Sequence, residues 1–419
     1  MAYETWVGPT YLSTWAGTLG IERSQLAWLT ALPILGSLGQ CLGVLLFLRL
    51  AKNVSLKHLC LTLTLLARAL WLIPLAAAWS GAAITHQSVG MIGILAAVSS
   101  AIGLTSTSFW MAWMRTLVPA QQEGWFWGGR NHWSTIGVLF AHFFSAIWLK
   151  ANPGASAFQI LLLLALMSAA GSVWLLSRLP QTPKSSSGET FRFEFTRLWE
   201  PEFKELLIFA GLFHGAMYMA GPYFPYYFTH ELKLNGSHVA FWSIMAQLGM
   251  WFTSSFWGRR LDSNGGLAFR FLGKPISILK FGTILMALSP LPYLISNPKI
   301  VQWIGPVEYF INGVASAAYA IALNTLIFQR TRGNAFMSMT LFSALTATQG
   351  ILGASTAFVG SKILDIAPAN GFQALWVIAA VARLGVVLFF CPKLNLRPSS
   401  SSDQSKPLSD GASNLAHEL

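Results

Sequence analysis

The chain has 419 residues, of which 54% are hydrophobic and only 10% charged, against about 25% charged in an average soluble domain. Its 27 Lys and Arg exceed its 15 Asp and Glu, which gives a formal net charge of +12. A nucleic-acid-binding protein carries such an excess on a solvated surface, whereas here the basic residues lie between long apolar runs. The composition excludes a soluble globule, a disordered chain, a collagen-like fibre and a nucleic-acid partner. It indicates an integral membrane protein whose surroundings are a lipid bilayer.

The three cysteines, Cys41, Cys60 and Cys391, lie in or beside apolar stretches, with no C-x-x-C pair and no nearby His. We therefore expect packing residues rather than a zinc site or a disulfide framework, and no metal or other cofactor. The first twenty residues lack the basic region of a cleavable signal peptide. No Walker A loop is found, so a nucleotide-binding site of this chain is not expected to supply energy from ATP.

A helix needs about 20 apolar residues to cross the hydrocarbon layer, because every backbone polar group must be satisfied within it. Continuous runs of this kind argue against the alternating strands of an outer-membrane barrel. The sequence thus predicts an all-α integral membrane protein with twelve spans, near 5–21, 26–48, 58–79, 91–114, 132–149, 158–177, 206–229, 239–257, 275–296, 301–327, 337–361 and 373–391.

The distribution of Lys and Arg predicts the orientation. The connections after spans 2, 4, 6, 8 and 10, together with the C-terminal tail, hold nineteen of these residues, and the opposite connections hold five. Only Arg68, Lys280 and Arg383 fall within spans. We expect both termini in the cytoplasm and a multi-pass protein of the cytoplasmic, or inner, membrane.

The predicted organisation is two six-helix bundles joined by one hydrophilic segment. The N-terminal bundle covers 1–178 with a short first helix, the cytoplasmic linker 179–205, the C-terminal bundle 206–396, and a disordered cytoplasmic tail 397–419. The linker has flexible composition at 183–188, and its aromatic and charged residues at 191–199 favour the membrane surface. Only three residues precede Glu4, so we expect either a mis-assigned start or a truly shortened first helix.

The two halves resemble each other in sequence. Leu38-Gly39-Gln40 in span 2 has a counterpart in Gln247-Leu248-Gly249 of span 8, and Pro74 corresponds to Pro290. After span 8, Gly258-Arg-Arg-Leu-Asp262-Ser-Asn-Gly265 is similar to the signature loop of the major facilitator superfamily. The chain is thus identified by resemblance as a bacterial-type member of no assigned subgroup. The resemblance implies two pseudo-symmetric six-helix bundles around a central cavity.

The same resemblance assigns gating roles to loop residues. In the signature loop, Gly258 and Gly265 would permit tight turns, and Asp262 would cap a helix and pair with a basic residue. The first-half copy has Lys52 where the Asp belongs. The stretch from Leu117 to Asn131 is similar to a turn after the fourth helix in a group of bacterial members, with Glu123 in place of Arg. Arg115 lies just before this stretch and Arg130 lies near its end.

Ionisable residues at membrane depth are candidates for function. Arg68 could bind an anionic substrate, or it could clamp backbone carbonyls between helices. Glu308 begins a polar stripe on span 10 with Asn312, Ser316 and Tyr319, all within an arc of about 80°. This Glu could load and release a proton inside a water-filled cavity, or it could lie at the extracellular rim. Lys280 and Arg383 are expected to snorkel or pair locally.

Further candidates are polar or aromatic residues within the spans. His214 and Tyr218 lie one turn apart on span 7, before the helix-breaking Gly221-Pro222 and Pro225. Amides and imidazoles suit hydroxylated or zwitterionic ligands, but they also join helices. The remaining candidates for contact with substrate are His142, Gln349, Gln40, Gln247, Trp110 and Trp113.

Secondary active transport by alternating access is the function that these features favour. We expect a monomer that takes up a small polar organic solute, with protons as the coupling ion. The antiporter signature Gly-x-x-x-Gly-Pro is not found in span 5, which disfavours, without excluding, a solute or drug exporter of the same fold. A membrane-embedded transferase, which would make the chain an enzyme, and a solute sensor remain as alternatives of other classes.

Overall fold

The computed structural model describes residues 2–19, 23–50, 54–79, 86–117, 123–152, 154, 156–181, 195–262, 274–331, 335–366 and 370–395. These residues are overwhelmingly helical and form no strand. Nine helical stretches of this described part are long and apolar enough to cross a membrane. The chain is a multi-pass membrane protein. The flexible part of the linker, 183–188, and the tail at 397–419 lie outside the described residues.

Helices occupy each of the six predicted spans of the N-terminal half. The first three spans are each divided in two, at Gly8, at Gly36–Ser37 and at Leu70–Trp71, whereas the next three are single helices. Their bounds are α1 Ala2–Trp6, α2 Pro9–Leu19, α3 Arg23–Leu35, α4 Leu38–Leu50, α5 Leu56–Ala69, α6 Leu72–Trp79, α7 His86–Leu117, α8 Glu123–Ala151 and α9 Ala157–Arg178.

The C-terminal half also has a helix at each predicted span. Span 7 is interrupted after Ala220, where Gly221 and Pro222 were expected to break it, and it ends in a π-helical turn. The bounds are η2 Phe195–Trp199, α10 Pro201–Ala220, α11 Tyr223–Tyr226, η3 Tyr227–Glu231, α12 Gly236–Asp262, α13 Pro275–Leu288, η5 Leu291–Leu294, α14 Pro298–Thr331, α15 Ala335–Ile366, α16 Gly371–Phe390 and η6 Pro392–Asn395.

One loop boundary differs from expectation. Gly258 lies inside the last turns of α12 and not in a tight turn, because the helix continues to Asp262. The hydrophobic run ends at Trp257, but a helix needs apolar residues only at membrane depth and can extend into water through charged residues such as Arg260.

Glycines allow several helices to approach at backbone distance. A Cβ atom on Gly313 of α14 would lie 1.9 Å from the carbonyl oxygen of Ala246 in α12, and one on Gly249 of α12 would lie 2.2 Å from that of Phe310. In α4, a Cβ on Gly39 would lie 2.1 Å from the carbonyl oxygen of Ala101. Gly39 and Gly43, four residues apart, therefore allow α4 to lie close to α7.

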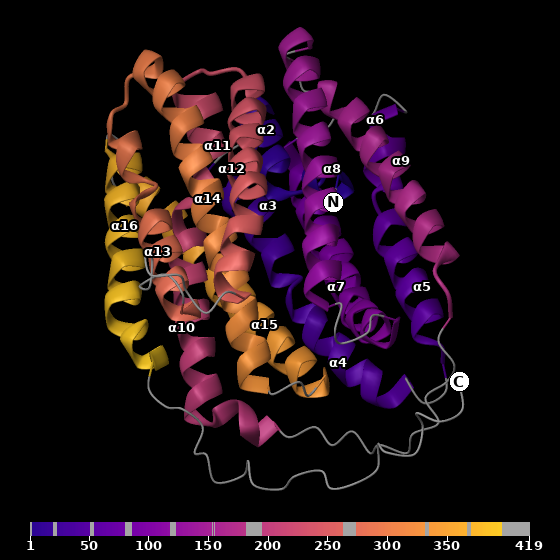
Figure 1. The fold of residues 1–419 in the computed structure, drawn as a ribbon. Helices are drawn as coiled ribbons and strands as arrows, with labels where there is room; N and C mark the ends of the chain where they lie inside the picture. The colour runs from indigo at the N-terminus through magenta and orange to yellow at the C-terminus, as the bar shows by residue number, and fades with distance from the viewer. Residues whose placement is uncertain are drawn as a thin grey trace, which may run out of the picture.

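The two halves meet along two pairs of helices, α3 and α4 against α15, and α8 against α12 (Figure 1). One buried apolar cluster contains residues of both halves, including Leu26 of α3, Trp242 of α12 and Leu364 of α15. A second cluster belongs to the C-terminal half alone, and a third belongs to the N-terminal half apart from Met339.

The shared cluster lies at one end of the bundle. It contains residues from the beginnings of α3 and α12 and from the last turns of α15. The separate clusters contain residues near the opposite ends of the same spans, namely Val44 of α4, Trp257 of α12 and Leu341 of α15. Within the described chain, the halves therefore share a core at one end and have largely separate cores at the other. The charge distribution predicts that the shared core is on the extracellular side.

Candidate functional site

A polar cluster forms where α10, α14 and α15 meet. The Tyr319 hydroxyl of α14 lies 3.3 Å from Nδ1 of His214 on α10, and Nε2 of Gln349 on α15 donates to the same hydroxyl at 3.4 Å. The ring centroids of His214 and Tyr218 are 5.9 Å apart. The structure thus brings together four residues that come from three spans of the C-terminal half.

This cluster borders the seam between the halves. A Cβ atom on Gly353 of α15 would touch both the Tyr218 ring and Ile34 of α3, so Tyr218 lies next to the other half. His214, Tyr218 and Gln349 are half-buried, so each keeps some accessible surface beside this seam.

Glu308 occupies a different environment from this cluster, although it is on the same stripe of α14. Its side chain is buried, and its Oε2 accepts a 2.8 Å hydrogen bond from the Tyr293 hydroxyl in η5. The Tyr293 ring packs against Phe224 and Phe228 of the interrupted seventh span, with centroids 5.3 and 5.0 Å away. The carboxylate therefore contacts the aromatic packing that supports this interruption.

Arg68 and Arg383 both direct their guanidinium groups at backbone carbonyls. Arg68 of α5 donates from Nη1 to the Ala169 carbonyl of α9 at 3.0 Å and to the Ser172 hydroxyl. Its guanidinium also lies 5.3 Å from the ring centroid of Tyr3. This arrangement corresponds to the carbonyl clamp, one of the two readings that the sequence left open.

Arg383 of α16 is fully enclosed. It donates to the carbonyls of Ala216, Met217 and Met286, at 2.9 to 3.2 Å, and to the Ser289 hydroxyl at 3.1 Å. In each half, one arginine thus joins helices of the third and sixth spans and contacts the first span of that half.

In the N-terminal half, His142 of α8 pairs with Tyr11 of α2. Their hydrogen bond, between the Tyr11 hydroxyl and Nδ1, is 2.9 Å long, and the two rings stack. One turn away, Trp6 Nε1 donates to the Ser145 hydroxyl at 2.8 Å. Tyr11 and His142 are buried at 2% and 6% exposure, so the pair lies inside the packed core.

The two candidate tryptophans of α7 differ in their surroundings. Trp113 is fully buried, and its Nε1 donates to the Pro180 carbonyl at 3.3 Å. Trp110 is half-buried, and the guanidinium of Arg130 on α8 lies 4.7 Å from its ring centroid. Of the gating residues, Gly265 lies outside the described residues, and the side chains of Arg115 and Asp262 are not described.

The remaining amides lie on helices that face the seam or the cluster. Asn312 of α14 and Gln247 of α12 are half-buried. Gln40 of α4 is 2% exposed, and its Oε1 has no hydrogen-bond partner in the described chain. Other buried oxygens without such a partner follow both sides of the contact between α4 and α15, in Ser37, Thr340 and Ser343.

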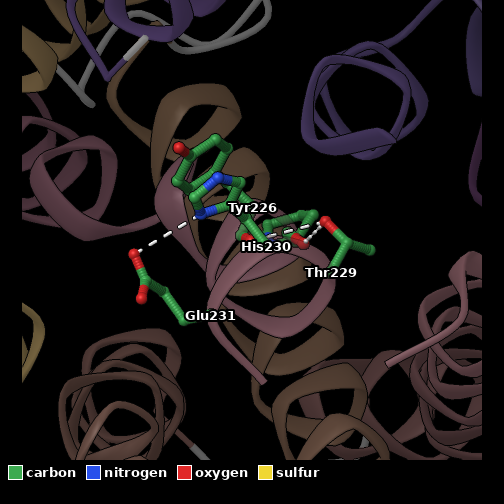
Figure 2. A network of polar contacts seen from close by, with 5 residues as sticks. Tyr226, Thr229, His230 and Glu231 are labelled. Carbon is green, nitrogen blue, oxygen red and sulfur yellow. Dashed lines mark hydrogen bonds and ion pairs between the residues drawn. The ribbon is translucent and has the colours of Figure 1, made fainter. Parts of the chain in front are cut away.

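The π-helical turn was not anticipated from the sequence. Thr229 donates to the carbonyls of Pro225 and Tyr226, and His230 stacks on Tyr226 and lies 3.5 Å from a Glu231 carboxylate oxygen (Figure 2). Pro225 is the one local signal for this irregularity, because it lacks a backbone N–H. The turn packs against α2, which extends the contact between the halves at the end where they share a core.

Among the described residues, no group of three or more His, Cys, Asp or Glu side chains could hold a metal ion.

Solved structures of similar shape are membrane transporters. A mutant of the nucleoside transporter NupG aligns with a TM-score of 0.69 at 14% identity, over 94% of this chain and 96% of its own. A D-xylose-proton symporter aligns with 0.64 at 11% identity, over 95% and 97%. A bacterial homologue of the human lysosomal transporter Spinster, in an inward-facing state, aligns with 0.63 at 14% identity, over 94% of each chain.

No family model matches the sequence, and no curated protein sequence matches it either. The likeness to the solved transporters nevertheless covers both halves. The chain therefore has the major facilitator fold of these transporters, with which the twelve spans predicted from the sequence are compatible.

Proposed function

We propose that this chain is a secondary active transporter that moves a small polar organic solute by alternating access, in symport with protons. The neighbouring structures include a proton symporter and a nucleoside transporter, which supports transport of small polar solutes. In this proposal the chain acts as a monomer in the cytoplasmic membrane, with both termini in the cytoplasm.

The observation that carries the proposal is the core shared at one end only. A protein whose halves are joined at the extracellular end and have largely separate cores at the cytoplasmic end is in an inward-facing state, and rocking of the two halves would reverse it. The polar cluster around Tyr319 borders the seam between the moving bodies, where a transported solute must bind.

We place the coupling proton on Glu308. A buried carboxyl is far easier to accommodate neutral than charged, and this one has the Tyr293 hydroxyl as its hydrogen-bond donor. Tyr293 packs against the interrupted seventh span, so a change in the charge of Glu308 would alter the packing at the extracellular end.

Uptake into proteoliposomes with an imposed pH gradient tests the proposal. When the outside medium is more acidic than the lumen, protons flow inward, and this gradient should drive accumulation of a transported solute in the wild type. The Glu308→Gln variant keeps an oxygen for Tyr293 but cannot release a proton, so its uptake should no longer respond to the gradient, while exchange of solute across the membrane continues.

The control is Asp365→Asn, which alters an exposed carboxylate near Lys362. Its response to the gradient should match the wild type. Gradient-driven uptake by Glu308→Gln would remove the assigned coupling site, and the absence of flux for every solute would remove the transport function itself.

A further inference from the structure

The hydrogen bonds around Tyr319 have a defined direction. Its buried hydroxyl accepts from Nε2 of Gln349, and its own hydrogen needs an acceptor. Nδ1 of His214, 3.3 Å away, is the partner available among the described residues. His214 must then be neutral, with its proton on Nε2, a tautomer that follows from the network of hydrogen bonds.

This direction leaves a specific set of groups unused. Nε2–H of His214 is a donor, Oε1 of Gln349 is an acceptor, and the Tyr218 hydroxyl can act as either. None of these atoms has a hydrogen-bond partner in the described chain, and none is a buried atom without one. They therefore keep accessible surface, and the Tyr218 ring places this surface beside the seam between the halves, next to Ile34.

Two buried charged groups of the same half are engaged elsewhere. The guanidinium of Arg383 is bound by three backbone carbonyls and a hydroxyl, and Glu308 is bound by Tyr293. No hydrogen bond or ion pair joins His214, Tyr218, Tyr319 or Gln349 to a charged side chain of the described residues. A charged cargo would lose its hydration here without gaining a counter-charge, which is strongly unfavourable.

The unused groups also surround aromatic faces. The rings of His214 and Tyr218 are inclined at 37°, and Tyr319 in turn stacks on Phe213. Flat or ring-shaped molecules pack well on such faces, and the adjacent donor and acceptor can bind their polar edges.

Resting on the proposed transport function, we propose that the cargo is an uncharged, ring-bearing solute with neighbouring hydrogen-bond donors and acceptors, bound by His214, Tyr218 and Gln349. The base of a nucleoside and the hydroxylated ring of a sugar share this chemistry. An amino acid or a dicarboxylate does not, because its ionised groups would have no partner in the cluster.

Thermal unfolding of the purified full-length protein separates these classes, because a bound solute raises the unfolding temperature. The probes are uridine, glucose, glutamate and succinate. We expect a rise with uridine or with glucose, and the one that acts identifies whether a base or a sugar ring is bound. A rise with glutamate or succinate alone, or with none of the four probes, would overturn the proposal.

Two variants locate the binding. Gln349→Leu removes the acceptor at similar volume, and Tyr218→Phe keeps the ring but removes the hydroxyl. Each should weaken binding of the active probe about three- to tenfold, the usual effect of one lost hydrogen bond. Ser355→Ala, on the exposed face of α15, is the control and should bind as the wild type does.

Unliganded unfolding temperatures show whether the variants fold. Unchanged affinity in both folded variants would contradict the assigned site. Flux measurements distinguish the two proposals. Binding of uridine or glucose without flux would contradict the transport function and support the ligand class. Flux of a charged solute through the wild type would contradict the ligand class and support the transport function.

Discussion

At the scale of single residues, the two buried arginines have a structural part that their charge alone does not reveal. Arg68 and Arg383 donate to main-chain oxygens of neighbouring helices, which lie in a part of the membrane where water cannot supply donors. From α16, the single side chain of Arg383 donates hydrogen bonds to both α10 and α13. Each half is thus held together internally by one guanidinium, which suits a body that moves as a unit.

Replacing Arg383 by Met should therefore reduce stability rather than affinity for cargo. The change removes all the hydrogen bonds by which this guanidinium joins α16 to α10 and α13, and we expect a loss of about 3 kcal/mol in the free energy of unfolding. Unfolding by heat or denaturant in detergent measures it. Lys280→Met, at an exposed position of α13, should unfold like the wild type. A variant of normal stability that no longer binds its solute would instead give Arg383 a role in the binding site.

At the scale of elements, glycine decides which helices lie closest. α12 and α14 touch through Gly249 and Gly313. At each glycine, a backbone carbonyl oxygen of the other helix occupies the place that a side chain would need. This pair connects the helix at the seam, α12, with the helix that carries both Glu308 and Tyr319. The separation of the two axes therefore affects both Glu308, the proposed coupling group, and the polar cluster.

Gly313→Ala tests this close approach. Its added methyl group would stand 1.9 Å from the Ala246 carbonyl oxygen, so the helices must move apart, and we expect a loss of about 1–3 kcal/mol in the free energy of unfolding. Gly258→Ala is a matched control on α12, because no atom of the described residues outside its own stretch of helix lies within 4 Å of the new methyl group. Its stability should stay the same or rise by up to about 1 kcal/mol, since Ala is the better helix former. Equal stability of the two variants would contradict the packing.

At the scale of the whole molecule, α2 meets the seventh and eighth spans at the end that the charge distribution predicts to be extracellular. The methyl carbon of Thr14 in α2 would lie 3.0 Å from a Cβ on Gly236, the first residue of α12. This contact joins the two halves at the end that holds the shared core (Figure 1). Rocking to an outward-facing state must break it.

A disulfide between Thr14→Cys and Gly236→Cys should consequently stop transport. The positions are close enough for the bond, and oxidation would hold the halves together in the inward-facing state. Uptake by the double variant should fall to background after oxidation and return after reduction, while each single variant stays active under both conditions. Unimpaired uptake by fully cross-linked protein would show that this end does not open.

The sequence by itself determined where the apolar helices lie, since the structure has a helix at each predicted span, and it predicts their division into two halves with basic residues at alternate ends. These follow from local rules, because hydrocarbon thickness sets the length of each apolar run and each helix satisfies its own backbone. The break in the seventh span also has a local cause, because Gly221, Pro222 and Pro225 predict an interruption of the helix.

Only the tertiary structure decided which polar side chains meet. His214, Tyr218 and Gln349 were candidates for substrate contact from the sequence, and Tyr319 was part of the polar stripe. Nothing in the spacing of spans 7, 10 and 11 placed them around one hydroxyl. Likewise, the stripe from Glu308 to Tyr319 shares one face of α14, yet one end meets Tyr293 and the other meets His214. A helical period fixes the direction of a side chain around its own axis, whereas its partner depends on which helices pack beside it and at what depth.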